Sequence, residues 1–256
     1  MKKIIALVLA VAMMAVCFAS CGQDNADTSS TNDTSKKEVL TMATNATFPP
    51  YEYYDGEKII GIDAEIAQAI ADKLGMELKI EDMEFNSIIS YVNSGKNVFG
   101  MAGMTVTEDR LKNVDFTTSY AKGIQSVIVK EGSSIKSLDD LKGKKIGVQL
   151  TTTGDIYATD DFGADYVVQY NKATDCVLGL KNGDVDAVII DNAPAQVFVE
   201  ENKGLVLLDT EYANEDYAIA VKKGDSEFLK KLDDAIKALI ADGTVQKIVD
   251  KYIPAK

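Results

Sequence analysis

The stretch "NVFGMAGMTVTEDR", residues 97–110, sets the fold class and ends in the only arginine of the 256-residue chain. Its first half is apolar and is typical of a buried strand, and it runs directly into threonines and charged residues. The same order returns in "KIGVQLTTT", residues 145–153. This repeat indicates two halves, each with about the content of one small doubly wound α/β sheet.

Strand and helix patterns alternate on both sides of this stretch, which favours parallel sheets with helices on both faces. Strands are expected at residues 38–44, 77–82, 97–106, 144–150, 165–170 and 186–191. Helices are expected at 62–74, near 87–92, after 151–153, at 174–181, at 193–201 and twice at the C-terminus. Asp63 is the expected N-cap of the helix 62–74. In sheets of this kind ligands bind beyond the carboxyl ends of the strands. The candidate ligand-binding residues are therefore the polar residues at strand ends, Asn45, Thr105, Gln149 and Asp191.

Arg110 allows two interpretations. The other 26 basic residues are lysines, and only arginine presents a flat, charged fork that fits a carboxylate with two parallel hydrogen bonds. Alternatively, Arg110 pairs with Asp109 or Asp115 at the surface, which would contribute little. The residues alone do not decide between the two.

The N-terminus predicts export. Residues 1–20 combine a basic start with an apolar run that is too short to span a membrane, as in a secretory signal peptide. The ending "FASC" resembles the bacterial lipobox, which implies a lipid on Cys21; cleavage without a lipid is the alternative. Residues 22–37 are polar and lack aromatic side chains, so residues 21–37 should form a lipidated, disordered tether.

Composition excludes several classes of function. The net charge of −13 argues against nucleic acid and anionic lipid as partners, and no second apolar segment is long enough to cross a membrane. With no histidine and no paired cysteines, a zinc or copper site is not expected, and neither is any cofactor. Cys176 is expected to be a buried apolar residue.

Five segments together resemble the extracellular solute-binding proteins of family 3, the amino-acid-binding proteins of ABC importers. They are "ATNATFPPYEYYDGEKIIGIDAEIAQAIADKLG", "AGMTVTEDRLKNVDFTTSY", "LDDLKGKKIGVQLTTTGD", "GDVDAVIIDNAPA" and "DYAIAVKKGDSEF". The resemblance covers residues 38–253 and implies a type II periplasmic-binding-protein fold, in which two doubly wound α/β lobes are joined by two crossing segments and hold the ligand between them. We expect one lobe at 38–127 with 221–256 and the other at 128–220.

The resemblance also implies roles for individual residues. Arg110 and Thr105 would take the α-carboxylate of an amino acid, helped from the other lobe by Thr152 and Thr153 at a helix start, where free N–H groups attract an anion. As an alternative, these threonines only cap the helix. Asp191 would receive the α-ammonium, with helix capping as its alternative role. The ammonium would also bond to the Gly103 carbonyl, and the small side chain of Ala102 would let the ligand approach the backbone closely.

The identity of the amino acid stays open. Phe48 and Phe85 match family aromatics that sandwich the ligand's side chain, although core packing is an alternative for both. Asn45, Glu52 and Gln149 lie where selectivity is decided. Many relatives that bind cationic amino acids have aspartate at the position of Asn45, so the amide points to a polar ligand, whereas "VQLTTTGD" is most similar to arginine- and lysine-type binders. Tyr51, Tyr53 and Tyr54 are expected to pack their loop rather than line the cleft.

The predicted function is to bind a polar or cationic L-amino acid by hinge closure and to deliver it to the permease of an ABC importer. The protein is expected to act as a monomer outside the cytoplasm, held to the membrane only by its N-terminal lipid. One rival is an enzyme on the same fold, a cyclohexadienyl-dehydratase-like protein or a wall-cleaving lyase, with Glu52, Glu84 or Glu108 as acid or base. The other rival is the sensing domain of a receptor.

Overall fold

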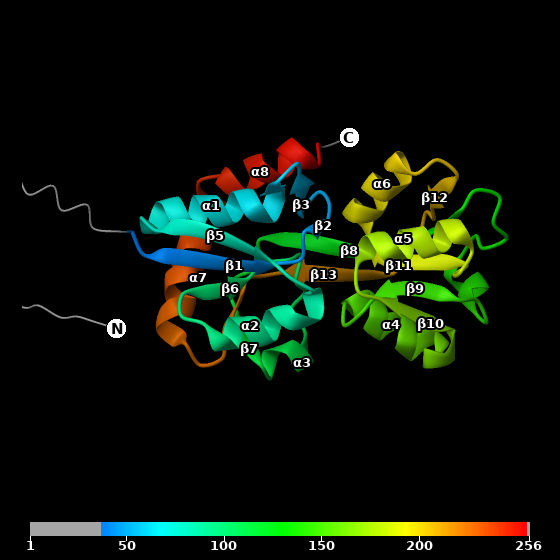
Figure 1. The fold of residues 1–256 in the computed structure, drawn as a ribbon, viewed down its shortest axis with the longest axis horizontal. Coiled ribbons are helices and arrows are strands. Elements are labelled where there is room, and N and C mark those ends of the chain that lie inside the picture. The colour runs from blue at the N-terminus through cyan, green and yellow to red at the C-terminus, as the bar shows by residue number, and fades with distance from the viewer. Residues whose placement is uncertain (1–36, 255–256) are drawn as a thin grey trace, which may run out of the picture. The chain divides into compact units, whose positions relative to one another are not determined.

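The computed structural model describes residues 37–254, and Figure 1 shows two groups of elements within them. The predicted signal peptide, the lipidated Cys21 and nearly all of the tether therefore lie outside the described residues. Among the described residues, no helix is both long enough and apolar enough to cross a membrane.

The first lobe is built on a five-stranded sheet in the order β5-β1-β6-β14-β7. Its strands are β1 (Val39–Thr44), β5 (Glu77–Asp82), β6 (Val98–Gly100), β7 (Val114–Phe116) and β14 (Ala220–Lys222). Its helices are α1 (Ile62–Leu74), α2 (Ile88–Ser94), α3 (Glu108–Leu111), α7 (Ser226–Ala241) and α8 (Thr244–Tyr252), with a 3-10 turn at Phe85–Ser87. A small sheet of β2 (Thr47–Phe48), β3 (Glu52–Asp55) and β4 (Lys58–Ile60) follows β1.

The second lobe is built on a six-stranded sheet in the order β10-β9-β11-β8-β12, with β13 also paired to β8. Its strands are β8 (Ala121–Lys130), β9 (Ile146–Gln149), β10 (Val167–Tyr170), β11 (Ala187–Asp191), β12 (Leu205–Leu207) and β13 (Ala213–Tyr217). Its helices are α4 (Thr153–Phe162), α5 (Ala173–Asn182) and α6 (Asn192–Glu201), with 3-10 turns at Leu138–Leu141 and Ala164–Tyr166.

Helices cover both faces of each sheet because alternate strand residues are apolar on both sides. On β1, Leu40 and Met42 belong to the core that includes α1, whereas Ala43 faces the core that includes α2. In the second lobe, Ile128 packs with α5 and α6, and Val127 packs on the opposite face with Ala158 of α4. Cys176 is buried in the first of these cores, as predicted.

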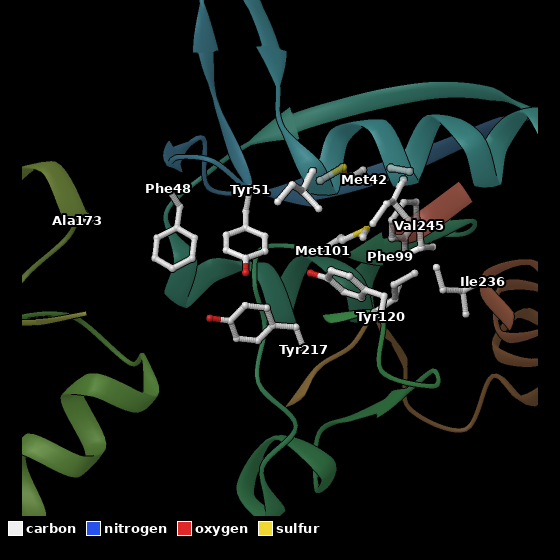
Figure 2. Packing of buried hydrophobic residues seen from close by; sticks show 14 of the residues in the cluster. Met42, Phe48, Tyr51, Phe99, Met101, Tyr120, Ala173, Tyr217, Ile236 and Val245 are labelled. Carbon is white, nitrogen blue, oxygen red and sulfur yellow. The ribbon is translucent and has the colours of Figure 1, made fainter. Parts of the chain in front are cut away.

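The chain crosses between the lobes twice. It passes from β7 into β8 and returns from β13 into β14, and β8 and β13 pair antiparallel along Ala121–Gln125 and Ala213–Tyr217. Tyr217, at the end of β13, packs edge-on against Tyr51 with ring centroids 5.3 Å apart. Figure 2 shows these two rings close to Phe48 and Tyr120. The crossing segments are therefore anchored in the core beside the loops that follow β1.

Three local predictions need correction. Asp63 does not cap α1, because Gly61 occupies the N-cap and the carboxylate of Asp63 accepts hydrogen bonds from the Gly103 N–H and the Tyr120 hydroxyl. The strand expected at 97–106 ends at Gly100, since Gly103 has a φ of +52° that a strand does not allow. Both sheets are mixed rather than parallel, because β14 and β8 run antiparallel to their neighbours.

Candidate functional site

A pocket of about 320 Å³, including its opening to solvent, lies where loops from the two lobes face each other. All eleven residues predicted to bind a ligand line it, together with Glu52. They are Asn45, Phe48, Phe85, Ala102, Gly103, Thr105, Arg110, Gln149, Thr152, Thr153 and Asp191. Asn45 follows β1, Gln149 ends β9 and Asp191 ends β11, as expected of strand-end residues. Thr105 is not at a strand end, because β6 already ends at Gly100.

Arg110 is buried at the pocket and joins the two lobes. Its Nη1 donates to the Thr105 carbonyl at 2.7 Å and its Nη2 donates to the Thr151 carbonyl of the second lobe at 3.1 Å. Its guanidinium also lies 5.2 Å from the ring centroid of Phe85. Burial lowers the pKa of Arg110 to about 10, while the charges of Glu215 and Asp191 act in the opposite direction, so the group stays cationic at neutral pH.

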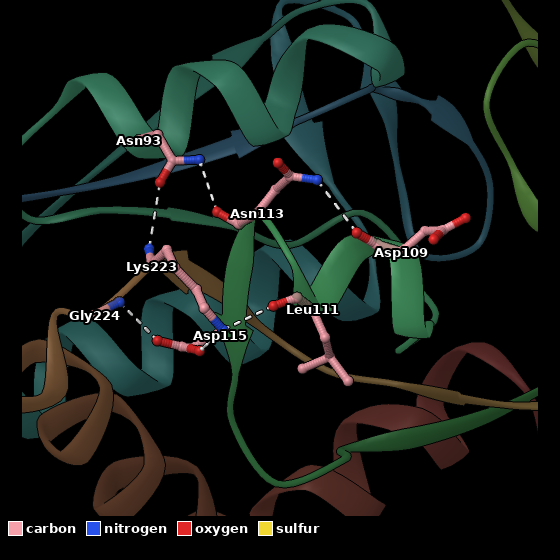
Figure 3. A network of polar contacts seen from close by, with 7 residues as sticks. All are labelled: Asn93, Asp109, Leu111, Asn113, Asp115, Lys223 and Gly224. Carbon is pink, nitrogen blue, oxygen red and sulfur yellow. Dashed lines mark hydrogen bonds and ion pairs between the residues drawn. The ribbon is translucent and has the colours of Figure 1, made fainter.

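The surface-pair interpretation of Arg110 is wrong. Asp109 pairs with Lys112 at 2.5 Å, and Asp115 pairs with Lys223 at 2.7 Å. Figure 3 shows Asp115 bonded to Lys223 and Gly224. Because both aspartates have lysine partners, the guanidinium is available to the pocket.

Asp191 stands at the N-cap position of α6, but its side chain makes no capping hydrogen bond. It instead accepts a hydrogen bond from the hydroxyl of Tyr217. Burial, reinforced by the nearby charge of Glu215, raises the pKa of the Asp191 carboxyl well above its ordinary value. Ionising this buried carboxyl costs free energy, and a cation placed beside Asp191 would offset that cost.

The threonines at the start of α4 have different surroundings. The hydroxyl of Thr152 accepts from the Asp155 N–H at 3.3 Å and donates to the Gln149 carbonyl at 2.7 Å, so it caps the helix. The hydroxyl of Thr153 lies 3.5 Å from Nε2 of Gln125. Since both residues also line the pocket, capping and proximity to a ligand are compatible. Helix α4 therefore begins at the pocket, with its N-cap Thr152 and its first residue Thr153 among the lining residues.

Gly103 is held in a conformation that favours glycine. Its φ is +52°, its N–H donates to Oδ2 of Asp63 at 2.9 Å, and a Cβ atom would lie 2.9 Å from Cε1 of Phe48. The same Oδ2 accepts from the Tyr120 hydroxyl at 2.8 Å. Asp63 therefore holds the backbone of Gly103, which lines the pocket, in place. Its expected role as a helix cap did not suggest this.

Asn45 and Gln149 meet across the pocket. Nε2 of Gln149 donates to Oδ1 of Asn45 at 2.9 Å, and Nδ2 of Asn45 donates to the Met83 carbonyl at 2.8 Å. This amide pair connects the first lobe to the second at the end of the pocket where selectivity was expected.

The two aromatic candidates lie on the first-lobe side. Phe48 is buried and stacks on Tyr51 at 5.9 Å, whereas Phe85 lies beside Arg110. Glu52 is paired in register with Phe48 and lines the pocket. Burial and the neighbouring Asp63 raise the pKa of Glu52, and burial raises the pKa of Asp63 to about 6. The cluster of Tyr51, Tyr53 and Tyr54 does not line the pocket, as expected.

Sequence reasoning missed Glu215, Gln125 and Tyr217, which lie on the two crossing strands immediately behind the pocket. All three are buried, and their hydrogen bonds reach Thr105, Thr153 and Asp191. The sequence held no local signal for these three residues, because they reach the site only through the crossing of β8 and β13 between the lobes. Among residues 37–254, no group of three or more metal-ligating side chains is placed to hold a metal ion.

The two α/β lobes, the crossing strands and the pocket between them define the type II periplasmic-binding-protein fold. The chain belongs to the bacterial extracellular solute-binding proteins, family 3, whose family model matches residues 40–255. This membership places it outside the cytoplasm.

Similar proteins agree with this assignment. The arginine-binding extracellular protein ArtP of Bacillus subtilis (strain 168) is 34% identical over 98% of both chains. The probable histidine-binding protein of Neisseria gonorrhoeae is 31% identical over 98% of this chain and 96% of the relative. The solved structure of an ancestral arginine-binding protein bound to glutamine has a TM-score of 0.81 at 40% identity, with 86% of this chain and 99% of that one covered. These relatives are binding proteins and not enzymes, which favours binding over the catalytic rival.

Proposed function

We propose that this protein binds an L-amino acid with a polar or cationic side chain between its lobes and delivers it to the permease of an ABC importer. The observation that carries the proposal is that Arg110 and Asp191, one from each lobe, line the same pocket. A cation and an anion that line the same pocket match the two charges of a zwitterion. Relatives named as arginine-binding and histidine-binding proteins, and as parts of ABC transporters, support the ligand class and the transport role.

In this proposal Arg110 takes the α-carboxylate, together with Thr105 and the N-terminus of α4 at Thr152 and Thr153. Each charge-assisted hydrogen bond contributes about 1.5–3 kcal/mol. Because the Thr105 hydroxyl donates to Glu215 at 3.1 Å, it must change its partner to bond a ligand. Asp191 takes the α-ammonium with the Gly103 carbonyl, and Ala102 leaves room for the backbone of the ligand.

Phe48 and Phe85 hold the stem of the side chain, and Asn45, Glu52 and Gln149 contact its end. The lobes meet where β7 passes into β8 and where β13 passes into β14, and they close by hinge motion at these crossings. The ligand shifts the population toward the closed form that the permease recognises. No bond of the ligand is made or broken.

The test is a thermal-shift panel of the twenty L-amino acids, followed by calorimetry on those that stabilise the protein. Stabilisation by one or a few polar or cationic amino acids is expected, and the D-enantiomer of the best ligand should give no shift because its ammonium would miss Asp191. If none of the twenty stabilises the protein, amino-acid binding is refuted. Turnover of a prephenate-like cyclic acid would instead support the dehydratase.

The anchor is a separate proposal. We infer that Cys21 is lipidated after removal of residues 1–20. The lipid would anchor the monomeric protein to the outer face of the cytoplasmic membrane. Metabolic labelling with a fatty acid should mark the wild-type chain, and Cys21→Ser should abolish the label and release the protein into the medium. Retention of the variant at the membrane would contradict the anchor.

A further inference from the structure

Glu52 and Asp63 place two buried carboxyl groups against each other beside the pocket. Glu52 lies on β3, is 1% exposed and lines the pocket, and Asp63 lies in the first turn of α1 and is 0% exposed. Their two segments are joined by the backbone, because the Asp63 N–H donates to the Tyr51 carbonyl at 2.9 Å. The two carboxyl groups lie within hydrogen-bonding reach of each other.

One oxygen of each carboxyl is sealed from solvent. Oε2 of Glu52 and Oδ1 of Asp63 find no hydrogen-bond donor among residues 37–254. The other oxygen of Asp63, Oδ2, accepts from the Gly103 N–H at 2.9 Å and from the Tyr120 hydroxyl at 2.8 Å. An ionised carboxylate can only accept, so two ionised carboxylates cannot satisfy each other. A proton on one of them turns their contact into a hydrogen bond that satisfies both sealed oxygens.

The surroundings of the pair do not balance two negative charges. The titratable side chains that act on the pair from the neighbouring segments are Tyr51, Tyr120 and Asp191, and none of them is a cation. In the described part of the chain, no lysine or arginine forms an ion pair with either carboxyl. Burial raises the pKa of Asp63 to about 6 and, with the charge of Asp63, raises the pKa of Glu52 well above its ordinary value. Two carboxyl groups in contact away from water do not both ionise at neutral pH.

The hydrogen bonds of Asp63 decide which group holds the proton. Asp63 accepts from Gly103 and Tyr120, and bonds of this kind favour the charged form of a carboxyl. Glu52 has no such donor among the described residues. The proton therefore belongs on Oε2 of Glu52, which donates it to Oδ1 of Asp63. Because Oε2 is occupied in this way, Oε1 is the oxygen of Glu52 that remains for the pocket.

We propose that Glu52 and Asp63 share one proton at neutral pH and that Glu52 is thereby a positioning residue of the pocket. The O–H of Glu52 holds the Asp63 carboxylate, which in turn holds the N–H of Gly103 in the pocket wall. Toward the pocket, Glu52 presents a neutral oxygen and not a negative charge. Nothing in this pairing depends on the ligand, so its test is separate from that of the proposed function.

The experiment compares urea unfolding of the ligand-free wild type and of Glu52→Gln at four pH values between 5 and 8. The glutamine amide can donate to Asp63 without a titrating proton. Between the ordinary pKa of a glutamate and the raised one, the folded wild type holds a proton that the unfolded chain has released, so its stability falls as the pH rises. The unfolding equilibrium constant of the wild type should therefore rise relative to that of Glu52→Gln by up to about tenfold per pH unit.

Two comparisons isolate the pair from other acids. Asp191, whose pKa is also raised, titrates in both proteins and cancels from this ratio. Glu57→Gln is the matched control, because it makes the same exchange at an exposed side chain in the turn between β3 and β4. Its pH profile should follow that of the wild type. A merely structural role of Glu52 would change the stability of Glu52→Gln equally at every pH, and such parallel profiles would overturn the proposal.

Asp63→Asn gives a second test, which also applies if Glu52→Gln does not fold. Its amide can donate to Glu52, so the shared proton is no longer needed and the pH profile should flatten as it does in Glu52→Gln. The double variant should flatten the profile no further, because the two carboxyls titrate as one unit. Effects that add in the double variant would show two independent acids and would overturn the shared proton.

Discussion

Arg110 shows why a guanidinium is needed at this position of a chain otherwise built with lysine. Its two amino groups already reach carbonyls in both lobes, at Thr105 and Thr151, while its flat face lies over Phe85. A lysine ammonium is a point charge on a flexible stem and cannot serve both carbonyls and the proposed ligand carboxylate in one plane. We expect Arg110→Lys to weaken amino-acid binding by about a hundredfold or more, because fork geometry is lost although charge is kept.

Calorimetry with the best ligand of the panel measures this loss. The control is Lys112→Arg, a basic exchange two residues further on at an exposed side chain that pairs with Asp109. It should bind like the wild type. Binding of Arg110→Lys within threefold of the wild type would remove Arg110 from the carboxylate site.

Asp191 makes ligand stabilisation depend on pH. Its carboxyl pKa is raised in the free protein, chiefly by burial. The native state therefore holds this proton more tightly than the unfolded state, and ionisation costs stability as the pH rises through the raised pKa. A bound ammonium favours the ionised form and offsets that cost. The ligand-induced rise in melting temperature should thus be larger at pH 8 than at pH 5, with affinity falling by up to roughly tenfold per unit of pH as Asp191 is protonated.

Thermal melts with and without ligand at four pH values between 5 and 8 test this dependence. Asp191→Asn, which cannot ionise, should bind weakly and show little change with pH. A ligand-induced shift that is constant over this range in the wild type would contradict the ammonium role of Asp191.

At the scale of elements, the sequence predicted regular helices and strands better than the segment that forms the site. The apolar spacing of Phe228, Leu232, Ile236 and Leu239 located α7, and all four residues are buried. Residues 97–106 looked like one strand because their apolar run is continuous. The strand ends at Gly100, and beyond it Gly103 takes a φ of +52° with its N–H bonded to Asp63. A contact between residues 40 positions apart leaves no local signal in the sequence.

The site shows the same division. Residues with chemically distinctive side chains in matching motifs, such as Arg110 and Asp191, could be predicted. Glu215 could not be, because its importance comes from the neighbours that β13 acquires on crossing between the lobes, and alternation along a strand does not tell which lobe residue it will meet. The strand expected at 97–106 and the residue Glu215 were both predicted wrongly or missed because contacts between residues distant in sequence determine them.

Gly103 provides a prediction for this bent segment. Gly103→Ala adds both backbone strain at a φ of +52° and a contact of 2.9 Å with Phe48. Gly75→Ala is the matched control, because Gly75 has a φ of +68° at the end of α1 but open space around its Cβ position. The control should lose about 1–2 kcal/mol of folding free energy from left-handed backbone alone, without a change in affinity. Gly103→Ala should lose more and should also bind the amino acid more weakly.

Urea unfolding and calorimetry on both variants provide the comparison. Equal losses of stability, or unchanged affinity in Gly103→Ala, would show that the wall beside Phe48 adapts and does not set the shape of the pocket.

At the scale of the whole molecule, the proposed closure would depend on the contacts between the lobes. Around the pocket these contacts include the Arg110 bond to the Thr151 carbonyl, the Gln149 bond to Asn45 and the Thr105 bond to Glu215 of β13. Thr151 has a φ of +64°, which is unfavourable for a β-branched residue, so the second-lobe loop is held in a strained conformation where it meets Arg110. A ligand that bonds to residues of both lobes would add to these contacts and would shift the population toward the closed form.

The last prediction concerns this balance. Gln149→Leu removes the amide bridge to Asn45 while it keeps a side chain of similar size, so the lobes of the free protein should open more often. Small-angle scattering should give a larger radius of gyration for the free variant than for the free wild type, and saturating ligand should bring both to the same value if Arg110 and Asp191 supply most of the closing energy. Gln68→Leu is the control, because Gln68 is exposed on α1 and bonds Asp72 within one lobe at 2.9 Å. If free Gln149→Leu scatters like the wild type, the amide pair does not contribute to closure and the charged contacts alone hold the lobes together.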